Sequence, residues 1–454
     1  MRDLVGTIGD DKTMTDIWSQ EGILARTLRV EAAIATAHGA IGNISPDNAA
    51  EIARKANSEF VTLEKIRARD KRLNHMTMAM VETIADACDG DAGEYVHLSV
   101  GTSEIDDTTV ALQMRDSLEI FETRLIALAH ALADKATDYR DMMMPGRSFA
   151  QQIFPYSAGL RFAVWADEIC RHVERLRQAR PRIAVGQIRG VVGSKSDQHL
   201  MGGRTLELET RVLEQLELGA PAACDQLMER DRHGEYGWLL TSVALSLDKI
   251  AWTLRTHQRT EVAEFEEPFN RSGGVGSSSA PHKRNPIYCE RVCGLAKIVK
   301  GSFTTMMDSL RHEHECDVTG SLSEDFALRE ISVVCDAALR ILTSVIAGLS
   351  AHPENMLRNL SITKGRVISS VFLAELVKAG MGRQKAHGIV RAAGQRSYDE
   401  DRDFIECLFE SSEVARLLDL EQARQLLDWT RYKASADDDI AAVLAHVRSL
   451  DQES

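Results

Sequence analysis

A glycine- and serine-rich stretch past the middle of the chain carries side chains suited to acid–base chemistry. Residues 271–286 read Arg-Ser-Gly-Gly-Val-Gly-Ser-Ser-Ser-Ala-Pro-His-Lys-Arg-Asn-Pro. The glycines permit backbone conformations closed to other residues, so the segment can move and its amides can converge on an anion. Ser277 and Ser278 stand just ahead of a cation, Lys283, and an amide, Asn285. Gly/Ser-rich segments are usually flexible linkers, but the proline-bounded Lys-x-Asn ending favours a functional loop.

A cation and an amide on one short turn fit a particular kind of reaction. Removing a proton from the carbon next to a carboxylate creates a dianionic, aci-carboxylate-like intermediate. A site for that reaction must place fixed donors and a cation where the charge grows, and one such donor is worth roughly 100–1,000-fold in rate. Lys283 and Asn285 supply both groups.

A second stretch, residues 95–108, combines a histidine with small hydroxyls: Tyr-Val-His-Leu-Ser-Val-Gly-Thr-Ser-Glu-Ile-Asp-Asp-Thr. Thr102 and Ser103, followed by a helix, can hold an anion with their hydroxyls and the helix amides together. Both residue types are also preferred helix N-caps, and the two interpretations can hold at once. His97 is either a site residue or a half-buried packing histidine.

Residues 276–286 resemble the Gly-Ser-Ser-x-x-Pro-x-Lys-x-Asn-Pro signature of the fumarase/aspartase superfamily, and the similarity extends over nearly the whole chain. Within that superfamily, the amino-acid sequence is most similar to the branch of adenylosuccinate lyase and 3-carboxy-cis,cis-muconate cycloisomerase. The resemblance implies that Ser277 is the general base, with Ser278 beside it, and that Lys283 and Asn285 grip a substrate carboxylate. A free serine is a poor base, so loop amides and Lys283 must stabilise its alkoxide.

Residues 95–108 resemble the family's His-x-Gly-x-Thr-Ser-x-Asp-x-x-Asp-Thr motif, which implies that Thr102 and Ser103 bind substrate. His75 is similar to a histidine that lies near the substrate in adenylosuccinate lyases. Here Met76 replaces the aspartate of their Asn-His-Asp segment.

Residues 146–152, Gly-Arg-Ser-Phe-Ala-Gln-Gln, resemble the family's Gly-Arg-Thr-His-x-Gln motif. The motif's histidine serves as general acid in several members, and here its position holds Phe149, which cannot donate a proton. Muconate cycloisomerases also lack this histidine and carry a tryptophan. Arg147 and Gln151 are retained, and the resemblance implies that they bind substrate. Glu290, which the family pairs with the histidine, has lost its partner and is expected to be structural.

Two positions argue against a nucleotide substrate. Where adenylosuccinate lyases carry arginines that hold the nucleotide phosphate, this chain has Cys316 and Asp325. A phosphate dianion favours bidentate arginines, and an aspartate repels it. We therefore expect that AMP is not part of the substrate.

The composition is that of a globular protein and limits the classes of partner that the chain is expected to bind. The chain has 454 residues, of which 44% are apolar and 27% charged, and a formal net charge of −14, which argues against nucleic-acid binding. The eight cysteines are scattered and lack further ligands at metal spacing, so we expect no metal site, and we expect no cofactor. Because the N-terminus lacks an apolar signal core and no apolar run reaches membrane length, we expect a cytoplasmic protein with no membrane partner.

Only nine prolines occur, and the long proline-free spans with helical periodicity predict an all-α protein. We predict an N-terminal helical domain over 1–95, a central long-helix bundle over 96–350 with the loop 271–286, and a C-terminal helical domain over 351–454. The resemblance implies a homotetramer with a twenty-helix core, in which three subunits each supply one stretch to every site. One apolar seam of the predicted bundle is Leu118, Phe121, Leu125, Leu128 and Leu132.

These features predict a cofactor-independent carbon–nitrogen lyase that acts on a small dicarboxylate. It would expel an amine, a nitro group or a similar substituent from a substituted succinate and leave fumarate. The leaving group would depart unaided or be protonated by His97, His75 or water. Three alternatives stay open: a muconate-cycloisomerase-type reaction, adenylosuccinate lyase with a rebuilt phosphate site, and a non-catalytic structural homologue.

Overall fold

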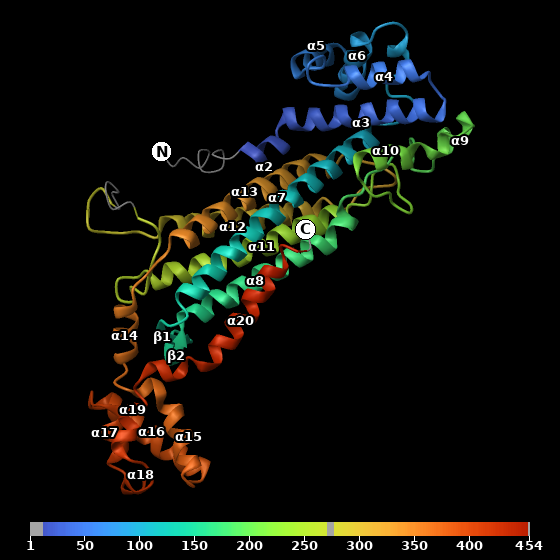
Figure 1. Ribbon diagram of the computed structural model, residues 1–454. Helices are drawn as coiled ribbons and strands as arrows, with labels where there is room; N and C mark the ends of the chain where they lie inside the picture. Colours follow the sequence, from blue (N-terminus) through green and yellow to red (C-terminus); the bar gives the residue numbers. More distant parts are fainter. Residues whose placement is uncertain (1–11, 270–276, 453–454) are drawn as a thin grey trace. The chain divides into compact units, whose positions relative to one another are not determined.

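The computed structural model describes residues 12–269 and 277–452, and this part of the chain is mostly α-helical (Figure 1). The all-α prediction is confirmed, while the division into three sequence regions stays a prediction. The chain folds into two compact units. Unit 1 comprises Met1–Arg124, His172–Leu245 and Gly294–Leu339, and unit 2 comprises Leu125–Arg171, Ser246–Cys293 and Arg340–Ser454.

Five long helices of the described chain have residues in both units, and four of them, all except α8, match periodic segments of the sequence. The predicted seam of the first is buried, since all five of its apolar side chains are 0% exposed. Residues three and four apart share one helix face, which is why this spacing produces a core stripe. The five are α7 (Thr102–Asp138), α8 (Ala158–Ile183), α11 (Asp231–His257), α12 (Ile287–Asp308) and α13 (Ser321–Gly348).

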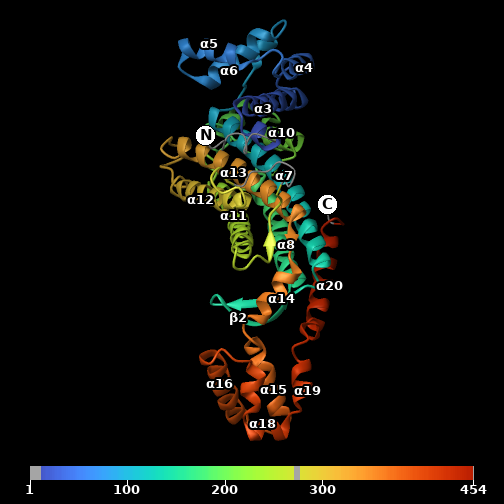
Figure 2. The ribbon, with the colours of Figure 1, turned by 90° about the vertical axis from the view of Figure 1, so that its left-hand side faces the viewer.

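Shorter elements complete unit 1: α2 (Lys12–Ile17), α3 (Gln20–Ile41), α4 (Pro46–Lys55), α5 (Leu63–Leu73), α6 (Met76–Ala87), η1 (Ala92–Tyr95), α9 (Ser196–Met201), η2 (Thr205–Glu207) and α10 (Leu208–Leu216). Helices α4, α5 and α6 gather over one side of α3 (Figures 1 and 2). Their common core includes Leu28, Ile52, Ile66 and Ile84. Hydroxyl side chains start several of these helices; the Ser45 side chain, for example, accepts from the Asn48 amide.

Unit 2 contains two small antiparallel sheets that the sequence did not predict. One pairs β1 (Met143–Ser148) with β2 (Gln151–Ser157), and the other pairs β3 (Phe265–Glu266) with β4 (Ser350–Ala351). The register of the first shifts between Gly146 and Arg147. A bulge of this kind redirects the side chains that follow it, and here it precedes a predicted site residue.

The C-terminal part of unit 2 is a cluster of short helices. Its core contains Phe372 and Phe404, whose rings meet edge-on at 5.7 Å. The elements are α14 (Pro353–Ser361), η3 (Arg366–Ile368), α15 (Ser369–Lys378), α16 (Arg383–Asp399), α17 (Phe404–Phe409), α18 (Ser412–Leu417), α19 (Leu420–Gln425), η4 (Trp429–Tyr432) and α20 (Ala434–Ser449).

Helix α13 corrects one expectation, because it is long and apolar enough to cross a membrane by length and composition. Its most apolar window has a mean hydropathy of 1.7, and 67% of that window is buried inside the protein. Burial of this extent is typical of a core helix in a globular protein.

We predict that Leu125→Ala lowers the free energy of unfolding by about 2–5 kcal/mol, because this α7 side chain is fully buried. The matched control is Leu200→Ala on α9, where the side chain is 86% exposed. The control should change the free energy by less than about 0.5 kcal/mol. Urea unfolding followed by circular dichroism compares the two, and equal effects would contradict the buried seam.

Candidate active site

The start of helix α7 is organised by the buried carboxylate of Glu104. It accepts hydrogen bonds from the backbone N–H groups of Gly101, Arg189 and Gly190. Burial raises the pKa of Glu104 against the opposing effect of these bonds. A glutamate that reaches back to the amide ahead of a helix is the acceptor of a capping box. The cap thereby fixes the turn on which Thr102 lies.

Ser103, in the same turn, lies next to the segment between α12 and α13. The Gln226 side-chain amide donates to Ser103 Oγ at 3.4 Å, and Cys316 Sγ lies 4.0 Å from the same oxygen. Cys316 occupies the position where the resemblance led us to look for a phosphate-binding arginine. The structure therefore places that position beside a predicted substrate-binding residue, with a thiol that carries no positive charge.

Acidic side chains surround the next turn of α7. Asp107 is buried and accepts from the Met228 amide at 2.6 Å and from the Gln187 side-chain amide at 2.9 Å. Arg230 contacts Asp107 at 2.8 Å and Glu324 at 3.0 Å. This guanidinium is therefore engaged by two protein carboxylates.

Two further carboxyls of unit 1 share these surroundings. The protein groups packed around Asp106, and then the charges of Asp107 and Asp325, raise its pKa. The surroundings of Asp325, followed by the charge of Glu324, raise its pKa as well. Both aspartates are exposed, so solvent limits the two shifts. Ionising neighbouring carboxyls places like charges together, which favours their protonated forms. A phosphate dianion at this position would meet the same repulsion.

His97 is paired with a buried acid. Its Nδ1 lies 2.6 Å from Oε1 of Glu31, and its backbone has a positive φ of 63°, which is uncommon outside glycine. Burial lowers the pKa of His97, but the hydrogen bond and charge of Glu31 outweigh burial and raise it overall. The ring therefore favours the charged form more than an ordinary histidine does.

His75 begins helix α6. Its Nδ1 accepts a hydrogen bond from the Met78 amide at 3.3 Å, as an N-cap side chain does. The ring is exposed. His75 therefore caps helix α6, and its contact with substrate stays a prediction.

The β1–β2 turn holds the position of the family histidine. Phe149 and Ala150 form this two-residue turn with φ of 49° and 63°. Hairpin turns with two positive φ values normally use Asn-Gly, and larger residues there store backbone strain. The Phe149 ring is 98% exposed, so no packing within the described chain holds it.

Arg147, just before the turn, is anchored by a buried carboxylate. Its Nη1 and Nη2 contact the two oxygens of Glu264 at 2.9 and 2.6 Å. His257 Nδ1, at 2.6 Å, and the Asn359 side-chain amide, at 2.8 Å, bind the same carboxylate. Burial opposes ionisation of Glu264, but the bonds from His257, Arg147 and Asn359 outweigh it and lower its pKa to about 2.

A cavity of about 410 Å³ adjoins this cluster in unit 2. Pockets of this size with a mixed polar lining suit small polar ligands. Two predicted substrate-binding residues therefore share one cavity. Its polar lining includes Arg147, Gln151, Asn359, Arg366 and Tyr398.

The described end of the signature loop forms a tight turn. Ser277 Oγ accepts from the Ala280 amide at 3.2 Å, and the Lys283 amide donates to the Ala280 carbonyl at 3.0 Å. Ser278 and Lys283 are exposed, and Asn285 is half-buried. The Lys283 ammonium forms no ion pair with the described part of the chain. The loop glycines fall within 270–276, outside the described residues.

Neighbouring side chains fix this turn at the start of α12. Arg284 pairs with Glu266 at 2.7 Å, and the Gln258 side-chain amide donates to the Arg284 carbonyl at 3.4 Å. Glu267 accepts from two amides of the first turn of α12, each at 3.1 Å. Residues 257–267 thus contact both the hairpin and the signature loop.

Sequence reasoning missed the anchoring residues of this segment. The run Glu-Phe-Glu-Glu at 264–267 was not singled out, and a cluster of acids close to His257 in the sequence was the available signal. Glu290 lies 3.5 Å from Arg255, and the structural role expected for it stays a prediction. The motif at residues 95–108 lies in unit 1, and those at 146–152 and 271–286 lie in unit 2.

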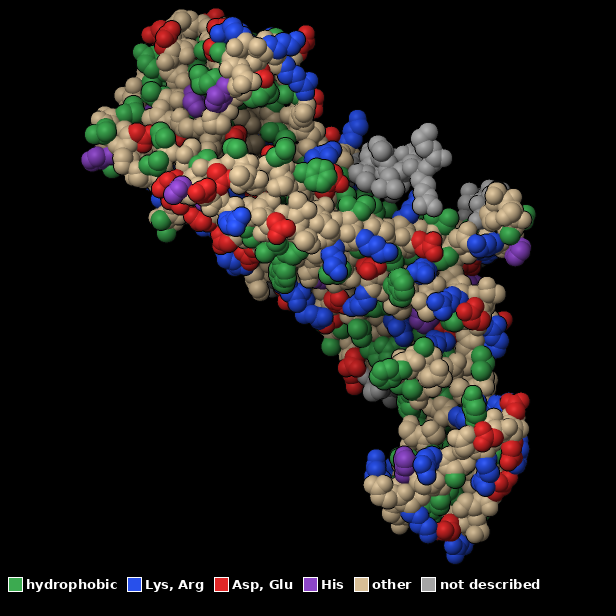
Figure 3. Space-filling view, turned by 180° about the vertical axis from the view of Figure 1, so that it is seen from behind, with side chains coloured by type: hydrophobic (Ala, Val, Ile, Leu, Met, Phe, Trp, Pro, Cys, Tyr) green, Lys and Arg blue, Asp and Glu red, His purple; other side chains and the backbone are tan. Residues whose placement is uncertain are grey.

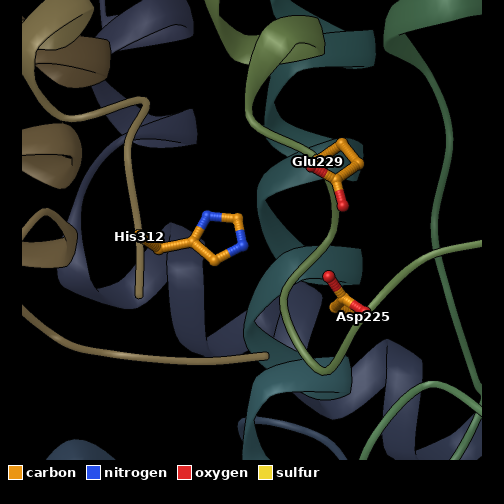
Figure 4. A group of neighbouring side chains, drawn as sticks. All are labelled: Asp225, Glu229 and His312. Carbon is orange, nitrogen blue, oxygen red and sulfur yellow. The ribbon is translucent and has the colours of Figure 1, made fainter. Parts of the chain in front are cut away.

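A separate group of possible metal ligands occurs in unit 1. The nearest ligand atoms of Asp225, Glu229 and His312 all lie within 4.8 Å of one another. Figure 4 shows the His312 ring directed towards the two carboxylates, which come from the segment before α11. No sequence motif singled out these residues.

Comparison with known families decides the membership of the chain. The family described as lyase matches residues 8–301, and the family described as adenylosuccinate lyase C-terminus matches residues 365–443. The chain belongs to the fumarase/aspartase superfamily of lyases. The resemblance inferred from its motifs is thereby confirmed, and the protein is a lyase enzyme.

Three similar proteins show the range of this lyase's relatives. Adenylosuccinate lyase of Methanocaldococcus jannaschii is 38% identical over 92% of this chain and 90% of its own. N-acetyl-S-(2-succino)cysteine lyase of Enterococcus italicus is 34% identical over 95% of this chain and 93% of its own. The crystal structure of 3-carboxy-cis,cis-muconate lactonizing enzyme from Pseudomonas putida superposes with a TM-score of 0.87 at 28% identity, covering 97% and 98% of the two chains.

The relatives support a β-elimination of the fumarate-lyase type. They do not bear out the expectation that the substrate lacks a nucleotide, because several of them are adenylosuccinate lyases. Adenylosuccinate-lyase-like and cycloisomerase-like features are both confirmed.

We predict that Glu264→Gln lowers the free energy of unfolding at pH 7 by about 3 kcal/mol, from the linkage between pKa and folding. Because the folded-state pKa of Glu264 is depressed to about 2 from an ordinary 4.5, its contribution is present above pH 4.5. The difference between variant and wild type should therefore shrink as the pH falls from 4.5 towards 2.

Glu207→Gln is the matched control, since the pKa of Glu207 is also lowered to about 2, by hydrogen bonds from Arg204 and Arg211. Glu207 is exposed, so solvent screens its ion pairs and its loss should matter little. Urea unfolding between pH 2.5 and 7 makes the comparison. A Glu264→Gln variant as stable as the control at pH 7 would contradict the anchoring role.

Proposed function

We propose that this lyase takes a proton from a 2-substituted succinate and expels the substituent, which leaves fumarate. The observation that carries the proposal is the contrast between two adjacent cations. Arg284 is fixed by Glu266 at 2.7 Å, whereas the exposed Lys283 ammonium forms no ion pair with the described residues. A cation on a fixed turn without a protein counter-ion is available to a substrate carboxylate.

Ser277 acts as the base. The hydrogen bond that the Ala280 amide donates to Ser277 Oγ, at 3.2 Å, favours the ionised oxygen. The oxygen removes the proton from the carbon beside one carboxylate, and the electron pair moves into that carboxylate. Lys283 and Asn285 stabilise the growing charge, with Ser278 beside the base. The pair then forms the double bond of fumarate as the bond to the substituent breaks, and the substituent leaves with the electrons of that bond.

We place the second carboxylate on Thr102 and Ser103 of a neighbouring subunit in a homotetramer. Support for a subunit contact comes from α11, where Trp238, Leu245 and Trp252 recur every seven residues and are 48%, 44% and 52% exposed. An apolar stripe of this kind is characteristic of a helix face that another helix covers.

Two features limit the identity of the leaving group: Phe149 at the tip of the β1–β2 hairpin and the acidic residues around Ser103. Phe149 cannot protonate a departing atom, so the substituent must be a weak base or take its proton from His97, His75 or water. A thiol, with a pKa of about 8.5, leaves as an anion more readily than an amine does. The acidic surroundings of Ser103 disfavour phosphate. We therefore propose a phosphate-free succinate linked through nitrogen or sulfur.

Two other enzyme functions have specific support. The overall similarity to the muconate lactonizing enzyme favours an intramolecular addition that would use the same groups in reverse. The identity to adenylosuccinate lyases favours a nucleotide substrate. A non-catalytic role fits less well, because Ser277, Lys283 and Asn285 are all present.

We predict fumarate release, seen by its ultraviolet absorbance, from at least one phosphate-free succinate among aspartate, argininosuccinate, nitrosuccinate and N-acetyl-S-(2-succino)cysteine. Ser277→Ala should lower that rate by about 100- to 10,000-fold, while Ser279→Ala, the matched neighbour, should stay near wild type. Turnover of adenylosuccinate alone would reject the phosphate-free substrate. Lactone formation from 3-carboxymuconate alone would favour the cycloisomerase reaction.

We further predict that two inactive variants complement each other if sites are shared between subunits. Co-expressed Ser277→Ala and Thr102→Ala chains should form mixed tetramers in which roughly a quarter of the sites receive both intact residues. Activity near a quarter of wild type is expected. Mixed tetramers as inactive as the single variants would show that one chain supplies both residues.

A further inference from the structure

A second cavity, of about 520 Å³, lies among the C-terminal helices of unit 2. We call it the C-terminal pocket; its lining includes Arg366, Ser369, Ser370, His387, Arg391 and Tyr398. On the face shown in Figure 3, basic and acidic side chains are mixed over the C-terminal helices. Among the described residues no carboxylate lines the pocket, although the whole chain carries a net charge of −14.

Four polar side chains of the C-terminal pocket have no protein partner among the described residues, and three of them, Ser370, His387 and Arg391, are exposed to solvent. Within the described chain, the side chains of Ser369, Ser370, His387 and Arg391 make no hydrogen bond or ion pair. Arg366 donates from Nη1 to the Ser397 hydroxyl at 2.8 Å, and this contact orients its guanidinium. Cationic and hydroxyl donors without internal acceptors are the arrangement that an anion completes.

The two serines lie where η3 runs directly into helix α15. Helix α15 begins at Ser369, and the Ser369 amide donates to the Arg366 carbonyl. The donors available to an anion here are therefore the side chains of the lining. Phosphate suits arginine forks because it offers more acceptor oxygens than a carboxylate.

The rest of the lining suits an organic group. Leu373 and Val390 supply apolar surface, and the Tyr398 ring, 72% exposed, lies over Arg366 at 5.6 Å. The volume is that of a pocket for a small organic molecule and exceeds the needs of free phosphate. Arg366 and Tyr398 also line the 410 Å³ cavity that holds Arg147.

We propose that the C-terminal pocket binds the phosphate group of a small metabolite, at a site separate from the chemistry of Ser277. Arg391 and the hydroxyls of Ser369 and Ser370 hold the phosphate, and the apolar wall holds the organic part. The proposal does not depend on the proposed function, because it concerns binding and not turnover.

Calorimetric titration of the full-length protein tests the site with two probes, inorganic phosphate and ribose 5-phosphate. We expect saturable binding of ribose 5-phosphate, and tighter binding of it than of inorganic phosphate if the apolar wall contributes. Arg391→Ala should weaken binding by roughly 10- to 100-fold. Arg383→Ala, on the same helix but outside the pocket lining, should change it less than about twofold.

A charge-reversal variant keeps the test independent of lost contacts. Ser370→Asp places a carboxylate in the first turn of α15, which favours the helix itself but repels phosphate. It should abolish binding and leave the circular dichroism unchanged. The proposal is overturned if neither probe binds at millimolar concentration, or if Arg391→Ala and Ser370→Asp bind as wild type does.

Discussion

One buried carboxylate holds together the part of unit 2 that carries two of the three motifs. Glu264 joins the hairpin, the end of α11 and α14 through Arg147, His257 and Asn359. A buried charge is tolerated only when its oxygens are fully bonded, so each partner is needed by the fold. Arg147 is therefore required by the fold in addition to its predicted part in substrate binding, whereas Phe149 sits at an exposed tip with no packing demand.

Local patterns predicted the long helices well. The absence of proline and the three- and four-residue spacing of the α7 seam are properties of neighbouring residues. The β1–β2 hairpin was not predicted from the sequence because Phe149 and Ala150 are not turn-forming residues. The anchoring role of Glu264 was not predicted because its partner Arg147 lies 117 residues away in the sequence. The cap of α7 was likewise hidden, since Glu104 also binds an amide 85 residues distant. Contacts of this range have no signature in a single sequence.

The signature loop was found by its motif, yet its energetics depend on residues outside the motif. Glu266 and Glu267 fix the turn and the start of α12, and Arg284 is drawn into this anchoring. Lys283 is left without an internal counter-ion in the described chain. The two units likewise differ in the charged groups that they bring to the proposed site. Unit 2 offers an available cation, and unit 1 offers a turn where the charges of neighbouring acidic groups raise the pKa of Asp106 and of Asp325.

Sequence similarity over the whole chain and the choice of substrate therefore depend on different residues. Relatives named adenylosuccinate lyase are similar over nearly the whole chain, but a family fold does not fix the group that departs. The hairpin tip bears on this directly. If the departing atom takes no proton from His97, His75 or water, negative charge accumulates fully on it. Rates across a series of substituents would then fall steeply with the basicity of that atom, as a large negative Brønsted coefficient. A chain with histidine at the tip would flatten the slope, so the phenylalanine makes leaving-atom basicity itself a selector among substrates.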